Sequence, residues 1–135
     1  MKKTQKKLGN KGFSLVELIV VIAIMAVLVG VLAPTLIKNI EKSRKSKDEQ
    51  NLDTVRGAIV TVLADEDYHS KLIGKNVIVN GSTGAITLSV EDTATLKELT
   101  DTIGSTKCQL TSKDLKDKTI TFKIDNDGKV EREDS

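Results

Sequence analysis

A carboxylate stands alone near the start of a long apolar run, and it is the first residue here that invites chemistry. Glu17 is the only charged residue between Gly12 and Ile37. A charged side chain at the centre of a membrane helix costs roughly 2.5–3.5 kcal/mol on insertion scales, and less near the interface. Ser14 lies three residues before Glu17, which is the spacing of a helix-capping box. We therefore expect Glu17 to cap its own helix, to meet a partner outside the chain, or both.

The other residues that could carry chemistry are isolated in the sequence. His69 is the only histidine and follows the acidic triplet Asp65–Asp67, a context more typical of a helix end than of a metal site. Cys108 is the only cysteine, so no intrachain disulfide can form, and we expect a buried, inert thiol. No catalytic triad, metal-ligand cluster or phosphate loop is recognisable. We expect no enzyme activity, no metal and no cofactor.

Two short motifs favour turns over binding sites. Aligning Asp125–Gly128 with a calcium loop places Lys123 at the first ligand position, so we interpret the motif as a hairpin turn. Asn80–Ser82 matches a glycosylation acceptor, but Asn-Gly is also a favoured turn pair, and we again predict a turn.

Charge is distributed unevenly along the chain. Five lysines precede Phe13 with no acid among them, as is typical of the cytoplasmic flank of a membrane segment. Residues 13–135 hold 16 Lys and Arg against 19 Asp and Glu, which argues against a dedicated nucleic-acid surface. Aromatic residues make up 2% of the chain, too few to favour stacking on bases or sugars.

The first secondary-structure element that the sequence predicts is a long helix. Residues 13–37 are apolar apart from Ser14, Glu17 and Thr35, and as a helix they would be roughly 37 Å long, enough to cross a bilayer. From Lys38 the sequence becomes polar, with apolar residues on one helical face between Leu52 and Leu63. We predict one helix from residue 13 to about residue 72.

After Gly74 the hydrophobic period changes to two, which predicts strands. Two hairpins and a short helix are expected, with strands at 76–80, 85–90, 118–124 and 129–133 and the helix at 93–103. The predicted fold is α+β, with a small antiparallel sheet packed on the amphipathic half of the long helix.

Residues 11–18 (KGFSLVEL), the apolar run and Pro34 together resemble the N-terminus of type IV pilins and pseudopilins, over about residues 7–40. The resemblance implies that a prepilin peptidase cuts between Gly12 and Phe13 on the cytoplasmic side, and that the new α-amine of Phe13 is methylated. It also implies that an inner-membrane assembly platform adds the subunit to a helical filament.

A type IV pilin-like fold is implied as well, with four regions along the chain. These are a leader peptide at 1–12, a transmembrane and filament-core helix at 13–37, an amphipathic continuation at 38–74 and a β-rich head at 75–135. Pro34 removes a helical hydrogen bond and is expected to kink or loosen the helix near Gly30. A proline tolerated in a straight membrane helix is the alternative.

Within this resemblance, Glu17 acquires a role in assembly. Cleavage after the small residue Gly12 removes the lysine block and leaves a positive amine on Phe13, four residues from Glu17. In a stack of offset helices that amine can meet the Glu17 carboxylate of a neighbouring subunit. Because either charge left alone would be penalised, we expect Glu17 to set the register of the homo-oligomer.

The implied function is that of a structural subunit, the major pilin, of a type IV pilus serving adhesion, twitching motility and biofilm formation. The protein would span the cell membrane once before assembly and lie in the extracellular pilus afterwards. A pseudopilin of a type II secretion or competence machine is the nearest alternative. A membrane-anchored binding or enzymatic domain is another. A signal peptide ending at Ala33 is disfavoured because Pro34 follows it.

Overall fold

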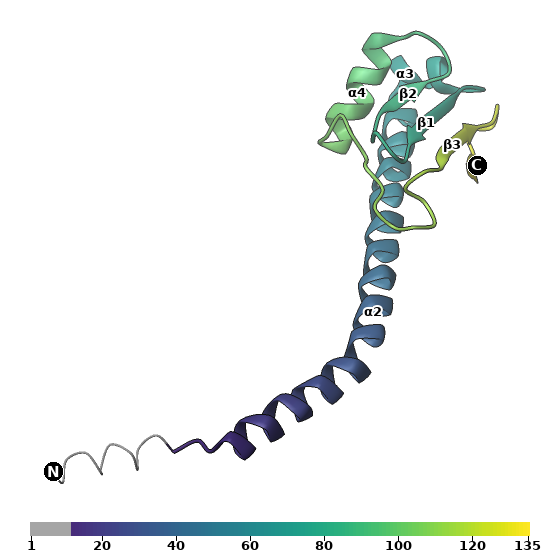
Figure 1. Cartoon of the computed structure of the whole chain (residues 1–135). Helices are drawn as coiled ribbons and strands as arrows, with labels where there is room; N and C mark the ends of the chain where they lie inside the picture. The colour runs from purple at the N-terminus through teal and green to yellow at the C-terminus, as the bar shows by residue number, and fades with distance from the viewer. Residues whose placement is uncertain (1–11) are drawn as a thin grey trace, which may run out of the picture. The chain divides into compact units, whose positions relative to one another are not determined.

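The computed structural model describes residues 12–135 (Figure 1), so most of the expected leader peptide lies outside the described residues. Helix α2 covers Leu15–Leu63, 49 residues, and contains Pro34. The chain divides into two compact units, with the boundary between Asn39 and Ile40. Each unit is described by itself below.

In the first unit, α2 is apolar and has no partner among the described residues 12–39. From Leu15 to Ile37 its large apolar side chains are 48% to 73% exposed. By length and composition α2 is a helix that could span a membrane, with a mean hydropathy of 3.1 in its most apolar window. The helix is continuous through Gly30 and Pro34, and the expected kink stays a prediction.

In the second unit, α2 buries one face, as its periodicity predicts. The buried apolar residues of this face are Leu52, Val55, Ala58, Ile59, Val62 and Leu63. The prediction that the helix continues to Leu72 is wrong, because α2 ends at Leu63 and α3 spans Glu66–Leu72. Asp65 adopts an extended backbone and accepts a hydrogen bond from the Asp67 N–H, so it starts a new helix.

Four strands form one antiparallel sheet within residues 12–135, in the order β2-β1-β3-β4. The strands are β1 (Asn76–Asn80), β2 (Ile86–Leu88), β3 (Thr119–Ile124) and β4 (Val130–Asp134). Both predicted hairpins are confirmed, and the central β1–β3 pairing joins them. Strand β2 is shorter than predicted. Helix α4 (Thr93–Ile103) matches its predicted bounds and begins at the N-cap Asp92.

The core lies between the sheet and the buried face of α2. One face of the sheet contributes fully buried side chains, including Val77, Val79, Ile120 and Phe122. Leu99 of α4 and Leu110 and Leu115 of the long connection to β3 complete the cluster. Figure 1 shows α4, β1 and β2 beside the C-terminal part of α2. The predicted α+β, type IV pilin-like architecture is confirmed.

Candidate processing and assembly site

The start of α2 forms a complete capping box. The Ser14 N–H donates to Glu17 Oε2 at 3.2 Å, and the Glu17 N–H donates to Ser14 Oγ at 3.1 Å. Two N–H groups that a helix end leaves without partners are therefore satisfied reciprocally. The carboxylate also lies in the first turn, where the helix dipole favours a negative charge. The described chain thus supplies a local role for Glu17.

The peptide bond between Gly12 and Phe13 lies outside this helix. Gly12 has φ +56°, in the left-handed region that a residue without Cβ adopts at little cost. Phe13 is 86% exposed, and regular helix starts two residues later at Leu15. The backbone at this bond is exposed and lies outside regular secondary structure.

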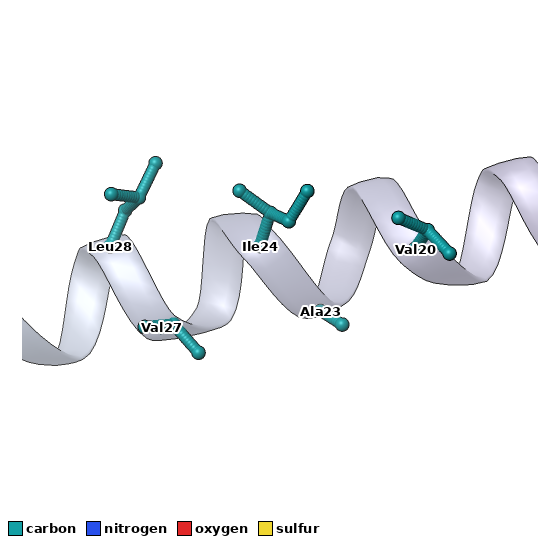
Figure 2. A pocket seen from close by; sticks show the side chains of 5 residues that line it. All are labelled: Val20, Ala23, Ile24, Val27 and Leu28. Atoms are coloured by element: carbon teal, nitrogen blue, oxygen red, sulfur yellow. The ribbon is translucent and has the colours of Figure 1, made fainter.

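Beyond the capping box, an exposed stripe of α2 is lined by aliphatic side chains. Figure 2 shows the five side chains that line it on successive turns: Val20, Ala23, Ile24, Val27 and Leu28. Their spacing of i, i+3, i+4, i+7 and i+8 places them along one stripe of the helix. Such a stripe can pack against lipid chains or against a second apolar helix.

A buried carboxylate on α2 forms hydrogen bonds with the loop that connects α4 to β3. Asp48 is fully buried and accepts hydrogen bonds from the N–H groups of Thr111 at 2.9 Å and Ser112 at 2.7 Å. Burial alone would raise the pKa of Asp48, but the hydrogen bonds from Ser112 and Thr111 outweigh it and hold the pKa below its usual value. About two turns earlier, Glu41 accepts a hydrogen bond from the Lys113 N–H.

Sequence reasoning missed this carboxylate. Nothing in the local pattern separates Asp48 from the exposed polar residues around it, and its partners lie 63 and 64 positions away. The one available signal was that Asp48 precedes Leu52 by four residues and therefore shares the buried face.

An ion-pair network connects the last strand to α2. Arg132 of β4 donates to both carboxylate oxygens of Glu49, at 2.6 and 3.3 Å, and to both of Asp134, at 2.7 and 2.8 Å. Bidentate pairs of this kind are among the stronger charged hydrogen bonds. The hydrogen bonds from Arg132, first to Asp134 and then to Glu49, raise its pKa further above an already high value.

The isolated candidates of the sequence have structural roles. His69 Nδ1 lies 2.9 Å from the carbonyl oxygen of Leu63. The imidazole therefore gives a hydrogen-bond partner to a carbonyl group that the end of α2 leaves without one. Cys108 is buried, and burial raises the pKa of its thiol, with a further contribution from the Asp48 charge. Asp125 accepts from the N–H groups of Asp127 and Lys129, which confirms the predicted hairpin turn.

The second predicted turn is also confirmed. Asn80 Oδ1 accepts from the N–H groups of Ser82 and Thr83, at 3.0 and 3.1 Å. Across residues 12–135, no group of three or more His, Cys, Asp and Glu side chains is placed to hold a metal ion.

Comparison with known proteins agrees with the geometry at the N-terminus. Residues 7–33 match the family model described as the prokaryotic N-terminal methylation motif. The chain is 33% identical over 85 residues to "Prepilin peptidase-dependent protein A" of Clostridium perfringens, a match that covers 62% of this chain. The chain spans 59% of the length of that relative. No solved structure matches the chain.

Proposed function

We propose that this chain, whose N-terminal segment matches the methylation motif, is the precursor of the major subunit of a type IV pilus. A prepilin peptidase removes residues 1–12, and the α-amine of Phe13 becomes N-methylated. The apolar part of α2, residues 13–37, holds the mature subunit in the membrane and later lies in the core of the filament. The pilus then serves adhesion, twitching motility and biofilm formation.

One observation carries this proposal above the others. An exposed, irregular Gly12–Phe13 peptide stands next to a capped carboxylate at the start of an apolar helix that has no partner in its own unit. A generic membrane anchor needs the apolar helix but not the carboxylate at residue 17. A filament subunit needs both, because Glu17 can exchange its capping bond for the amine of a neighbouring subunit.

The N-terminus of the mature chain tests the first step. Mass spectrometry of the protein isolated from cells that contain a prepilin peptidase should give a chain that begins at methylated Phe13. An unprocessed Met1, or an N-terminus near Pro34, would refute the proposal. Deleting the peptidase gene should restore the full-length chain.

The role of Glu17 in register can be separated from its role as a cap. Glu17→Ala should leave cleavage largely intact and strongly reduce filament growth. Glu17→Gln keeps a capping side chain but removes the charge, so it should fail in the same way. Ser14→Ala weakens the cap but keeps the charge, so filaments should still form. Normal pili from the Gln variant would contradict the register argument.

A pseudopilin of a type II secretion or competence machine is the second candidate, because it would share the same N-terminal segment. Sheared surface appendages composed of this chain would favour the pilin. Material that stays confined to the membrane after normal processing would favour the pseudopilin. A membrane-anchored binding or enzymatic domain would be favoured by a chain that is never processed.

A further inference from the structure

A basic segment lies on α2 shortly after the apolar run. Residues 42–47 (KSRKSK), here called the basic collar, contain four cations and no acid, and all six residues are exposed. The net charge of the chain after the collar is negative, because residues 48–135 hold 11 Lys and Arg against 17 Asp and Glu. The collar therefore concentrates positive charge at one place on an otherwise acidic unit.

The four cations surround the helix. At 100° per residue, Lys42, Arg44, Lys45 and Lys47 lie at about 0°, 200°, 300° and 140° around the axis. A protein partner that docks from one side would meet only part of this ring. A lipid surface crossed by the helix meets every side of the ring except the one that the loop 111–114 covers.

Few of these charges are neutralised by the chain itself. Lys45 pairs with Asp114 at 3.2 Å, but both side chains are more than half exposed, and such pairs contribute little. Arg44 lies 4.0 Å from Glu41. Among the described residues, Lys42 and Lys47 form no ion pair.

The position of the collar along the helix suits the lipid headgroups. Lys42 follows Ile37, the last residue of the apolar run, by five residues, or about 7.5 Å along a helix, close to the depth of a headgroup layer. Side chains on an α-helix tilt toward its N-terminus, which here is the direction of the membrane. Long Lys and Arg side chains can therefore reach back to phosphate groups.

We propose that the basic collar binds the headgroups of anionic phospholipids on the outer face of the membrane, and so holds the waiting subunit at a fixed depth. The inference rests on the proposed function for the orientation of the helix. Removal of the leader strips five lysines from the cytoplasmic side, which leaves the collar as the main cluster of cationic side chains beside the membrane span. The four cations lie within reach of the same anionic surface, so their attractions to it add.

The test uses the full chain in vesicles of phosphatidylcholine and phosphatidylglycerol, with spin-labelled versions of each lipid as probes. Electron paramagnetic resonance measures which lipid is immobilised beside the helix. We expect about a threefold preference for phosphatidylglycerol in dilute buffer, with most of it lost in about 0.5 M NaCl because salt screens the charges. Protection of the apolar segment from added protease establishes that the helix spans the vesicle wall.

Two variants make the test specific. The collar variant replaces three cations and leaves the Lys45–Asp114 pair intact: K42Q, R44Q and K47Q. The control variant makes the same charge change at three exposed lysines of the head: K107Q, K116Q and K118Q. The collar variant should lose most of the lipid preference, and the control should keep it.

The remaining outcomes overturn the proposal. If the collar variant prefers phosphatidylglycerol as strongly as the wild type does, the collar is not the lipid-binding site. The same conclusion follows if the collar variant and the control variant lose this preference equally. A collar variant that changes only self-association, measured by energy transfer at decreasing protein-to-lipid ratio, would assign the collar to the acidic surface of a second copy. The same variants are assayed for cleavage at Gly12–Phe13, so that normal cleavage without lipid preference refutes the collar alone. A wild-type chain that does not span vesicles would refute both proposals.

Discussion

The two parts of α2 obey the same backbone geometry but have opposite surroundings. Between Leu15 and Ile37 every large apolar side chain is about half exposed or more, whereas between Leu52 and Leu63 one face is almost fully buried. The later part finds its apolar partners in the sheet and α4. The earlier part has none among the described residues of its own unit, so its stable environment must come from lipid or from a second apolar helix.

The carboxylates of the two parts differ in the same way. Glu17 is exposed and bonded only to the backbone three residues away, so its cap can be exchanged for another partner at small cost. Asp48 is fully buried and bonded to a loop more than 60 residues away. Asp48 therefore stabilises the second unit, whereas no contact among the described residues ties Glu17 to that unit, as its proposed role in assembly requires.

The largest expected effect comes from the core. Phe122→Ala removes a ring that is 1% exposed, and we expect a loss of about 3–5 kcal/mol in the free energy of unfolding of the head. Urea titration of the full chain in detergent micelles measures it. The matched control is Leu28→Ala, since Leu28 is 52% exposed and should change head stability by less than about 0.5 kcal/mol. A comparable loss of unfolding free energy in both variants would contradict the conclusion that the two parts of α2 have different surroundings.

Asp48→Ala should have the next largest effect, because it leaves two N–H groups of the loop without an acceptor. We expect a loss of about 3 kcal/mol at neutral pH, measured by the same titration. Asp53→Ala, on the exposed face of the same helix, should change stability by less than about 0.5 kcal/mol. A small effect of Asp48→Ala would mean that the loop is held by its apolar side chains alone.

The pH dependence of stability follows from the same carboxylate. Because the pKa of Asp48 is lowered in the folded state, the folded protein binds this proton more weakly than the unfolded chain does. Its contribution is present above the unfolded pKa of about 3.9 and is lost as pH falls through the lower folded pKa. Asp48→Ala should flatten the loss of stability in acid. Some slope should remain, since hydrogen bonds from Thr95 also lower the pKa of Asp92.

Regular elements were predictable because their signals are local. The bounds of α4 and β1 match the prediction since an N-cap, a turn and a clear period mark them. The break after Leu63 was missed because residues 64–67 contain ordinary helix-compatible residues and neither Gly nor Pro. The extended backbone of Asp65 and the hydrogen bond that it accepts from the Asp67 N–H reveal the new start.

The loop between α4 and β3 could not be predicted in the same way. It has no hydrophobic period, yet it buries Leu110 and Leu115 and supplies the N–H groups that bind Asp48. These contacts are long-range, and the residues of the loop carry no local signal that predicts them. At the N-terminus the reverse holds, because the capping box spans four residues and its spacing alone predicted it.

A smaller effect is expected from a glycine in the head. A Cβ added at Gly81 would clash with the carbonyl oxygen of Leu115 and lie 2.6 Å from that of Lys118, so Gly81→Ala should destabilise the head by about 2 kcal/mol. Gly57→Ala is the matched control, because nothing lies within 4 Å of its added Cβ in the C-terminal part of α2. That variant should stabilise the helix by about 0.5–1 kcal/mol. Equal losses in the two variants would contradict the close approach at Gly81.

The smallest effect should appear at the N-terminal end of α2. Ser14→Ala removes the acceptor of the Glu17 N–H, so the first turn should open more readily by about 1 kcal/mol. Hydrogen exchange of the full chain in micelles should show the Glu17 amide exchanging about fivefold faster, while amides of β1 and β3 keep their wild-type rates. Because the first unit has no tertiary contact to transmit the change, faster exchange in the sheet would show that the two parts of α2 are energetically coupled. Confinement of the effect to the first turn would mean that the cap can be released for a new partner without loosening the head.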